Sequence, residues 1–404
     1  MKVLYIVPFV PWEIRVRSFN LIPRLARRHE IYLVSVSTHE PTMQEQAWID
    51  RYCRKSVHVK QSLPVALAHC LAALPTGTPL RMAYCRSREA QAAVRRFSDE
   101  VLPDVVYVER WRALDFLPEA VAAPLVCDPT DSMTLYNQRL LDAGSWWERL
   151  VAWGEHRKFS KCEGKLAMRP DACVFCSRVD LEAVQAQAPE ARFELVPNGV
   201  DCRSYFFKDE SEEQPGAIAF TGRLEYGPNR HAAEFFLNRV FPLIQSEVPG
   251  ASFTAVGKGA PRVLARYSGR PGFHAVDFVP DLRPFLARAA VTVAPLTVGA
   301  GVSNKLAEGF AVGTPVVATP LACGDLPVTS GNQLLIASDE HEFARHTISL
   351  LKDASLRRAI AARARRFVEG YDWEVVAGKM ENLLEEIGSK HSRESGERAL
   401  ATTA

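Results

Sequence analysis

The chain has 404 residues, more than one ordinary hydrophobic core holds, so two domains are expected. Apolar residues make up 47%, charged residues 24%, and the net charge is +2, a balance typical of soluble globular proteins. This balance gives no reason to expect a nucleic-acid partner, because DNA and RNA binding need a concentrated cationic face. Nine cysteines without regular spacing indicate a reducing compartment, here the cytoplasm.

Short apolar runs in the first half of the chain alternate with helical patterns. Near-continuous apolar runs, rather than alternating ones, are typical of parallel strands that are covered on both faces. The opening MKVLYIVPFVPWE predicts the first strand, because it lacks the apolar length and the small-residue cleavage site of a signal peptide. Strands are predicted at 3–9, 31–37, 104–109, 124–128, 172–177 and 193–198.

A long uncharged stretch, SLPVALAHCLAALPTGTPL (62–80), follows the second of these strands. It contains three prolines and a histidine, and its unbroken apolar part is shorter than the ~20 residues that span a bilayer. A buried helix is predicted here. The alternative is an interfacial helix that lies on a membrane surface.

The second half repeats the alternation of strand-like and helical patterns. Strands are predicted at 217–222, 252–257, 274–279, 291–295, 314–319 and 333–337, with a helix at 231–245. Turn residues and an acidic, weakly apolar stretch at 196–216 predict a linker between two domains. Helical stretches between the strands suit the crossovers of a parallel sheet.

The predicted fold is therefore α/β, with two Rossmann-like, doubly wound domains at 1–198 and 199–370. Ligands of open parallel sheets bind at the carboxyl ends of the strands, so two such domains facing each other would enclose a cleft. An amphipathic helix at 371–388 is expected to cross back to the N-terminal domain. The polar tail at 389–404 is expected to be disordered.

The stretch GAGVSNKLAEGFAVGTPVVAT (299–319) combines a glycine loop, a helix start, a cation and an anion. Free N–H groups and the dipole at a helix start form an anion site, and Lys305 adds charge in the first turn. Glu308 lies three residues further on, so both side chains can face one side. This pairing suits the phosphates and vicinal hydroxyls of a nucleotide sugar. The alternative is a surface ion pair worth ~0–1 kcal/mol. The candidate ligand-binding residues are Gly301, Val302, Ser303, Asn304 and Glu308.

A second candidate segment is FTGRLEYGPN (220–229). The predicted strand ends at Gly222, which places Arg223 at the carboxyl edge of the sheet. Arginine suits phosphate because its planar fork donates two parallel hydrogen bonds. Asn229 stands at the entry of the next helix. The alternative is that Arg223 is an ordinary surface residue.

These motifs, in their order, resemble the donor domain of GT-B glycosyltransferases of the large retaining family 4. The resemblance rests on VPNGVD (196–201), FTGRL (220–224), FVPDLRPFLARAAVTVAPL (278–296), KLAEGFAVGTPVVAT (305–319) and YDWEVVA (371–377). The start RVRSFNLIPRLARRHEIYLVSV (15–36) is similar to sugar transferases of bacterial exopolysaccharide and secondary-metabolite clusters. The resemblance covers nearly the whole chain.

The resemblance implies a donor nucleotide sugar held by the C-terminal domain and an acceptor held by the N-terminal one. Glu308 would bind the ribose hydroxyls and Arg223 the diphosphate. Two positions depart from the family pattern. Ala300 stands where family members often carry a glutamate that contacts the donor sugar, and Pro228 stands where many carry a lysine. Lys305 is expected to supply the missing cation.

The N-terminal domain offers arginines and aspartates near predicted strand ends. Arg15 and Arg17 could contact an acceptor phosphate or the donor diphosphate, and simple solvation is the alternative. Asp128 and Asp131 follow the strand at 124–128, and one of them could orient or deprotonate an acceptor hydroxyl or amine. A structural role in a turn is equally compatible with them.

A basic cluster extends along the same N-terminal segment. Arg24, Arg27 and Arg28 follow the first two arginines at helical spacing. They indicate either a solvated helix face or a patch that contacts anions or a membrane surface.

The predicted function is a retaining hexosyltransferase that moves a sugar from a nucleotide-diphosphate donor, UDP among the candidates, to an acceptor hydroxyl or amine. The acceptor could be a glycan, a lipid-linked sugar or a natural product. Arg223, Lys305, Asp128 and Asp131 are the candidate catalytic residues. No cofactor and no metal are expected, since no DxD motif is present. The expected location is the cytoplasm or, by peripheral contact, the inner membrane face. The alternatives are a non-catalytic GT-B subunit and a nucleotide-sugar epimerase.

Overall fold

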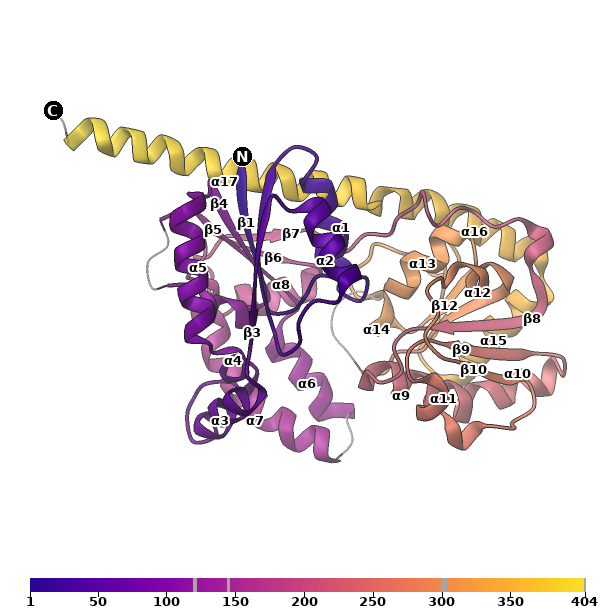
Figure 1. Cartoon of the computed structure of the whole chain (residues 1–404). Coiled ribbons are helices and arrows are strands. Elements are labelled where there is room, and N and C mark those ends of the chain that lie inside the picture. The colour runs from indigo at the N-terminus through magenta and orange to yellow at the C-terminus, as the bar shows by residue number, and fades with distance from the viewer. Residues whose placement is uncertain (119–121, 144–145, 299–303, 403–404) are drawn as a thin grey trace. The chain divides into compact units, whose positions relative to one another are not determined.

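A computed structural model of the chain describes residues 1–118, 122–143, 146–298 and 304–402 (Figure 1). The chain divides into two units. The first consists of Met1–Gln138, Arg149–Pro197 and Glu374–Ala404, and the second of Arg139–Glu148 and Asn198–Trp373. Both units are α/β, as predicted, and each is built on one parallel sheet. Among the described helices, none is both long and apolar enough to cross a membrane.

The first unit is built on a sheet of seven strands in the order β3-β2-β1-β4-β5-β6-β7. All six strands predicted for this half are present. The seventh, β3, was missed because KSVHVK alternates polar and apolar residues at the edge of the sheet, where one face meets water. The bounds are β1 (Lys2–Val7), β2 (Glu30–Ser37), β3 (Lys55–Lys60), β4 (Val105–Glu109), β5 (Leu125–Thr130), β6 (Ala172–Phe175) and β7 (Phe193–Leu195).

Helices of the first unit begin at residues that satisfy their free N–H groups. Thr42 and Glu45 form a capping box at α2, and Ser87 caps α5. The buried Glu163 carboxylate accepts from the N–H groups of Met133 and Thr134, which caps α6 from a distant helix. The bounds are α1 (Val16–Leu25), α2 (Met43–Tyr52), α3 (Leu63–Ala73), α4 (Leu80–Cys85), α5 (Arg88–Val101), η1 (Trp111–Phe116), α6 (Met133–Ala143), α7 (Trp146–Ala167) and α8 (Arg178–Gln185).

The uncharged stretch at 62–80 forms α3, but α3 is not the buried helix that we predicted. Only Ala66 and Ala73 are buried, and Leu71 is 68% exposed. The two alanines lie seven residues apart, so a single narrow stripe of the helix packs against the unit. The apolar composition of the stretch therefore does not reflect burial in the core.

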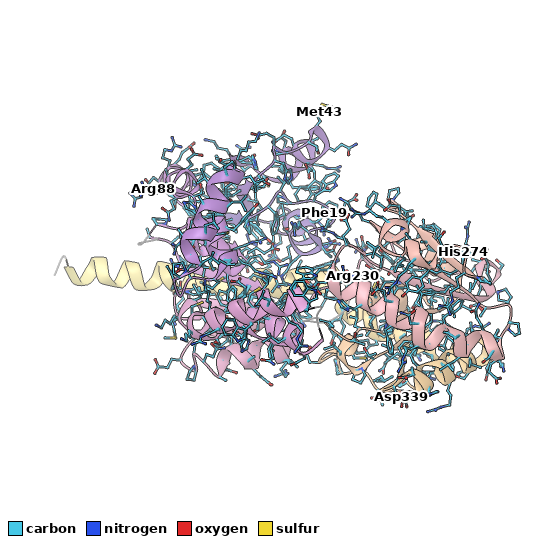
Figure 2. All side chains as sticks on the ribbon, turned by 90° about the horizontal axis from the view of Figure 1, so that it is seen from below. Phe19, Met43, Arg88, Arg230, His274 and Asp339 are labelled. Carbon is cyan, nitrogen blue, oxygen red and sulfur yellow. The ribbon has the colours of Figure 1, made fainter. Side chains whose placement is uncertain are left out.

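The second unit holds six parallel strands in the order β10-β9-β8-β11-β12-β13, and all six were predicted. Side chains fill its interior (Figure 2), with the Phe236 ring centroid 4.5 Å from that of Phe253 and 6.0 Å from that of Phe343. The bounds are β8 (Gln214–Thr221), β9 (Ser252–Val256), β10 (Phe273–Val276), β11 (Ala289–Ala294), β12 (Val316–Ala318) and β13 (Leu335–Ile336).

One predicted helix of the second unit is interrupted. Residues 231–245 lie in α9, a π-helical turn η3 and α10, because Pro242 has no N–H for a regular helical hydrogen bond. The bounds are η2 (Glu210–Glu212), α9 (Gly227–Phe235), η3 (Phe236–Val240), α10 (Phe241–Glu247), α11 (Ala260–Val263), η4 (Ala265–Tyr267), α12 (Arg283–Arg288), α13 (Asn304–Val312), α14 (Pro320–Cys323), α15 (Glu340–Lys352), α16 (Ala354–Val368) and η5 (Glu369–Tyr371).

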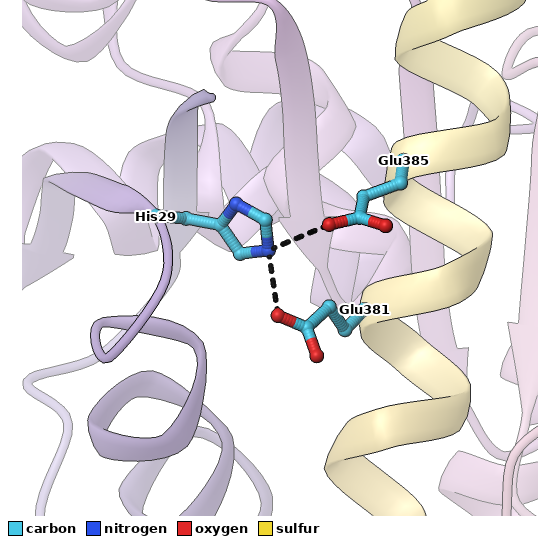
Figure 3. A group of neighbouring side chains, drawn as sticks. All are labelled: His29, Glu381 and Glu385. Atoms are coloured by element: carbon cyan, nitrogen blue, oxygen red, sulfur yellow. Dashed lines mark ion pairs between the residues drawn. The ribbon is translucent and has the colours of Figure 1, made fainter.

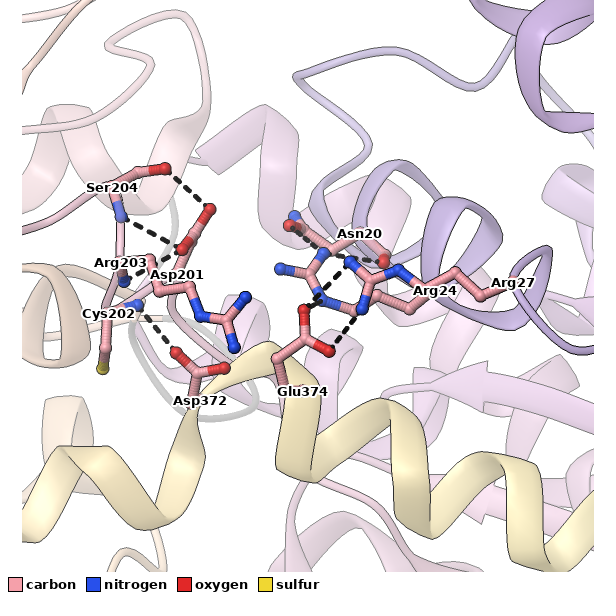
Figure 4. Close-up of polar contacts among 9 residues, drawn as sticks. All are labelled: Asn20, Arg24, Arg27, Asp201, Cys202, Arg203, Ser204, Asp372 and Glu374. Atoms are coloured by element: carbon pink, nitrogen blue, oxygen red, sulfur yellow. Dashed lines mark hydrogen bonds and ion pairs between the residues drawn. The ribbon is translucent and has the colours of Figure 1, made fainter.

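The last helix, α17 (Trp373–Thr402), packs on the first unit. Its Glu374 accepts hydrogen bonds from Arg24 at 3.1 Å and Arg27 at 2.7 Å (Figure 4). Glu381 lies 3.2 Å from Arg28. The three arginines at the end of α1 thus pair with carboxylates of α17, while Arg27 and Arg28 remain 57% and 68% exposed.

The residue before α17, Asp372, belongs to the second unit. Asp372 accepts a hydrogen bond from the Cys202 N–H at 2.8 Å, next to the turn that Asp201 closes with Ser204 (Figure 4). Val200 pairs with Asp372 as an isolated parallel bridge. These bonds join the end of the linker to the segment that precedes α17.

Two parts of the predicted domain layout differ from the structure. Residues 139–148, predicted within the N-terminal domain, group with the second unit, because Glu148 pairs with Arg230 and His231, each at 3.4 Å. The tail predicted as disordered continues α17 as far as Thr402. The tail is rich in Arg, Glu and Ala, which have high helix propensity and offset the low apolar content on which the prediction rested.

Two glycines let the loops after β8 and β9 touch. Gly257 has φ +145°, and a Cβ placed on it would lie 2.2 Å from the Gly222 carbonyl oxygen. Backbone atoms cannot yield to such a contact as a flexible side chain could. Glycine at position 257 therefore fixes the path of the loop that carries Arg223.

We expect Gly257→Ala to lower the free energy of unfolding by about 3 kcal/mol or more, from the clash and the positive φ together. Gly250→Ala is the matched control, because its Cβ would meet nothing within 4 Å; this change should stay within about 0.5 kcal/mol. Denaturant unfolding of the two variants measures the difference. Equal stabilities would contradict the steric account.

Candidate functional site

The candidate site of the second unit lies where the strand order reverses. β8 is the first strand of this sheet, and β9 and β11 flank it on opposite sides. Crossovers from β8 and β11 therefore depart in opposite directions and leave a crevice at the carboxyl ends of these strands. Helix α9 begins after β8, and α13 begins after β11. Side chains in the first turns of the two helices meet at this edge.

Lys305, in the first turn of α13, is anchored by Asn229 in the first turn of α9. Its Nζ donates a hydrogen bond to Asn229 Oδ1 at 2.7 Å and lies 5.2 Å from the ring centroid of Phe220. Asn229 Nδ2 in turn donates to the Arg223 carbonyl at 2.9 Å. Burial lowers the pKa of Lys305, and the Glu308 carboxylate opposes that shift. The site thus holds a desolvated cation whose charge is costly without an anion nearby.

Glu308 lies one turn further along α13 and faces the same region. Its Oε2 accepts a hydrogen bond from the Thr221 hydroxyl at 3.4 Å, at the end of β8. Burial raises the pKa of Glu308, and the Lys305 ammonium counteracts the rise. A carboxylate in this position can accept hydrogen bonds from hydroxyl groups of a ligand.

Gly222 makes room for this arrangement. Its φ is +141°, and a Cβ would lie 2.9 Å from Asn229 Nδ2 and 3.0 Å from Lys305 Nζ. A larger residue here would be strained at this φ and would crowd the ends of the Asn229 and Lys305 side chains. The sequence pattern identified Gly222, Asn229, Lys305 and Glu308 separately, and the structure brings all four together.

Arg223 extends from the same loop, but its side chain is not part of the Lys305 contact. The side chain is 51% exposed, and its Nε lies 3.5 Å from Glu225 Oε2. Arg262 also pairs with Glu225, at 2.8 Å. An exposed guanidinium with a distant partner can turn towards an anionic ligand at little cost.

The loop before α13 falls largely outside the described residues. Gly301, Val302 and Ser303 lie there, as does Ala300. Asn304 is the first residue of α13 and is partly buried. The predicted cradle of N–H groups therefore stays a prediction.

In the first unit, Arg17 and Asp128 form a buried ion pair. Arg17 Nε and the Tyr107 hydroxyl both donate to Asp128 Oδ2, and Thr130 Oγ1 donates to Asp128 Oδ1 at 3.2 Å. The Arg17 side chain is 3% exposed and that of Asp128 is fully buried. The sequence pattern assigned these residues to two different tasks, and the structure shows them engaged with each other.

The other two predicted residues of this unit are more accessible. Asp131 pairs with Arg110 at 3.4 Å, and its side chain is 27% exposed. Burial raises the pKa of Asp131 to about 6. The Arg15 guanidinium lies over the ring of Phe9, 4.5 Å from its centroid. Asp131 is thus the predicted carboxylate of this edge that can meet a ligand and take up a proton near neutral pH.

Sequence reasoning missed Glu109 and Arg110 at the end of β4. Glu109 accepts a hydrogen bond from the Tyr5 hydroxyl at 3.1 Å, and burial raises the pKa of Glu109 to about 7. Arg110 and Thr130 have φ values of +79° and +74°, which only a constrained backbone holds. The sequence could have indicated them only by their position, because they lie at the end of a predicted strand, at the edge of the sheet where ligands bind.

One group among the described residues could hold a metal ion. Ligand atoms of His29, Glu381 and Glu385 lie within 4.8 Å of one another (Figure 3). His29 Nε2 is 3.0 Å from Glu381 Oε1 and 3.7 Å from Glu385 Oε1. His29 precedes β2, so the group lies at the amino edge of the sheet, opposite Glu109 and Asp128. Its evident role is to attach α17.

Solved structures establish the class of fold. A sucrose-phosphate synthase from Thermosynechococcus elongatus superposes with a TM-score of 0.70 and 14% identity, over 96% of this chain and all of that one. Anabaena HepE in complex with UDP gives a TM-score of 0.66 and 15% identity, over 96% of this chain and 100% of that one. The two parallel-sheet units are those of the GT-B fold.

A family model matches part of the second unit. Residues 215–353 match the family model described as Glycosyl transferases group 1. This range contains Arg223, Asn229, Lys305 and Glu308. This part of the second unit is therefore similar to the group 1 glycosyltransferases.

Curated proteins are similar over longer parts of the chain. A 44.6 kDa protein in the cps region of Klebsiella pneumoniae is 22% identical over 360 residues, 85% of this chain and 88% of that protein. A phosphatidyl-myo-inositol mannosyltransferase of Mycolicibacterium smegmatis is 28% identical over 219 residues, 52% of this chain and 55% of that protein. The match thus spans about half the length of the mannosyltransferase.

We expect Asp128→Asn to lower the free energy of unfolding by about 3–5 kcal/mol, because the Arg17 guanidinium would stay buried without its carboxylate. The double variant Arg17→Met with Asp128→Leu removes both charges and should recover most of that loss. Denaturant unfolding of both variants tests this role. If Asp128→Asn leaves stability unchanged, the pair does not hold the unit together.

Proposed function

We propose that this glycosyltransferase moves a sugar from a nucleoside-diphosphate donor to an acceptor and retains the anomeric configuration. The observation that carries the proposal is the Lys305 ammonium, held by Asn229 at 2.7 Å where the strand order reverses. A partly buried cation at this edge gains most from a ligand with concentrated negative charge, and a diphosphate supplies it.

The protein's main contribution to the reaction is electrostatic. Negative charge builds up on the diphosphate as the glycosidic bond to it breaks, and fixed positive groups stabilise that charge. Lys305 and the start of α13 face it from one side, and Arg223 reaches it from the loop after β8. These groups supply the charge that a divalent metal supplies in other transferases, so the proposal requires no metal.

Glu308 is assigned to the donor's ribose. Its carboxylate is fixed by Thr221 at 3.4 Å and lies one helical turn from the cation that faces the phosphates. Vicinal hydroxyls can donate to its two oxygens. In the retaining reaction, the leaving diphosphate accepts the acceptor's proton on the same face, so no protein nucleophile is needed.

Two relatives suggest the substrates. HepE structures contain UDP and UDP-glucose, which supports a UDP-sugar as donor. The mycobacterial relatives are mannosyltransferases named for phosphatidyl-myo-inositol, which supports a lipid-linked acceptor. We assign the acceptor to the first unit, where Asp131 orients its hydroxyl or amine. The proposed location is the cytoplasm.

Lys305→Ala and Arg223→Ala should each lower the turnover of a UDP-sugar by about 10²–10³-fold, the usual effect of removing one group that stabilises transition-state charge. Release of UDP, measured over a panel of UDP-sugars with and without a lipid-linked acceptor, reports turnover. Unaltered thermal unfolding would show that the fold is intact.

Arg239→Ala is the matched control for Arg223→Ala. Arg239 is an exposed arginine of the same unit, and it pairs with Glu340 at 3.3 Å. It lies in η3, after the helix that leaves the carboxyl edge, so it should not affect turnover. Near-native turnover in Lys305→Ala, or an equal loss in Arg239→Ala, would refute the assignment.

The affinity for UDP should fall as the pH rises from about 7 towards about 10. Burial lowers the pKa of Lys305, so its positive charge is lost in a range where an exposed lysine, with a pKa of about 10.4, keeps it. A bound diphosphate restores the proton, so binding should take up protons in this range. Calorimetric titration in buffers of different ionisation enthalpy measures both effects.

The variant Lys305→Arg tests whether the pH dependence of UDP affinity comes from Lys305 and not from another titratable group. An arginine stays charged throughout this range, so the variant should bind UDP with an affinity that varies little between about pH 7 and about pH 10. A wild-type affinity that is flat over the same range would contradict the role of Lys305.

A further inference from the structure

The first unit exposes an apolar helix without charged side chains. Residues 61–80 contain no Asp, Glu, Lys or Arg, yet most of α3 within this stretch faces outwards. Leu63, Val65, Leu67, Leu71 and Leu74 are each about half exposed or more. Single exposed apolar residues need no explanation, but a whole uncharged apolar face marks a contact surface.

Helix α7 adds aromatic side chains to this surface. Trp153 is 57% exposed and Leu150 is 65% exposed, and both lie in the half of α7 that is rich in tryptophan. Trp146 and Trp147, at the start of the same helix, are also exposed. Tryptophan prefers the boundary between water and lipid, because its ring is apolar and its N–H is polar.

The exposed stripe of α7 changes character along the helix. Trp146, Leu150 and Trp153 lie at spacings of four and three residues, and Arg157, Lys161 and Lys165 continue the same stripe. All six side chains are exposed. The Arg157 guanidinium lies 5.8 Å from the Trp153 ring centroid. An apolar half thus passes directly into a cationic half on one face.

The acidic residues of α7 are turned away from this face. Glu155 accepts from the Leu80 N–H at 2.7 Å, and Glu163 accepts from Trp111 Nε1 at 2.9 Å. Glu148 pairs with Arg230 and His231 within the second unit. The exposed charges of α7 are therefore all positive, although the helix contains three glutamates.

Polar contacts hold α3 and α7 together. Lys158 Nζ, on α7, donates to the carbonyl oxygens of Ala73 at 2.7 Å and Leu74 at 3.4 Å, at the end of α3. Both helices lie at the same end of the first unit (Figure 1). The ammonium of Lys158 thus joins the end of α3 to the part of α7 that belongs to the same unit, which carries Leu150 and Trp153.

We propose that the exposed faces of α3 and α7 form a docking surface for an anionic lipid membrane. Leucine, valine and tryptophan side chains enter the acyl boundary, and Arg157, Lys161 and Lys165 contact lipid phosphates. Charge complementarity identifies the occupant, since apolar side chains beside cations of one sign match an anionic headgroup layer. The inference deepens the proposed function and rests on it only in assigning a lipid-linked acceptor.

Vesicle flotation of the full chain tests the surface directly. The probes are vesicles of phosphatidylcholine alone and of phosphatidylcholine with 30% phosphatidylglycerol, a composition chosen for its charge. Binding should be at least about tenfold stronger to the anionic vesicles and should weaken with added salt. Equal binding to both, or no binding to either, would overturn the proposal.

Variants locate the contact. Leu71→Glu on α3 and Trp153→Glu on α7 should each reduce the partition onto anionic vesicles by about tenfold or more, because each puts a like charge into the contact. Met43→Glu is the control, since Met43 is a 91% exposed residue of the same unit on α2 (Figure 2). Loss of binding in Met43→Glu as well, or retention in both test variants, would refute this surface.

Two further measurements separate other outcomes. UDP affinity without vesicles should be unchanged in Leu71→Glu and Trp153→Glu. If the wild-type chain binds vesicles but no nucleotide, the proposed function is wrong and the docking surface is still supported. Light scattering should find the wild-type chain and both variants in the same oligomeric state. If the chain forms a stable dimer that these variants dissociate, the occupant is a second copy and the membrane proposal is wrong.

Discussion

The hydrogen bond between Lys305 and Asn229 is the interaction on which the candidate site depends. It joins the first turns of α13 and α9, and Asn229 also holds the loop that carries Arg223. Gly222, with φ +141°, leaves room beside both side chains of this bond. Burial lowers the pKa of the lysine, and the Glu308 carboxylate opposes that shift. The ammonium therefore gains stability when an anionic ligand binds beside it. Backbone geometry, helix packing and electrostatics therefore converge on one ammonium group.

The carboxyl edge of the first unit is built differently. There the strongest charges neutralise each other, since Arg17 and Asp128 pair in the interior and Tyr107 donates to the same carboxylate. What remains for a ligand is the more accessible pair of Arg110 and Asp131. This contrast supports the proposal that the second unit binds a highly charged donor and the first unit a less charged acceptor.

Much of the fold could be predicted, because buried parallel strands have continuous apolar runs. The edge strand β3 was not predicted, because its polar and apolar residues alternate. Helix α3 was predicted to be buried, and this was wrong because apolar composition does not reveal what a helix packs against. The local motifs around Gly222 and Lys305 identified residues that the structure brings together at the candidate site. The Arg17–Asp128 pair could not be predicted, because its residues are 111 positions apart and only the sheet brings them together. Glu109 and Arg110 were not predicted as site residues, because they belong to no sequence motif.

A crystal structure of the chain with UDP bound tests the central claim most directly. The account predicts that the diphosphate lies at the carboxyl ends of β8 and β11, with Lys305 Nζ and the Arg223 guanidinium within hydrogen-bonding distance of its oxygens. The Glu308 carboxylate should accept hydrogen bonds from the ribose. A nucleotide bound elsewhere, or one whose phosphates neither Lys305 nor Arg223 contacts, would contradict it.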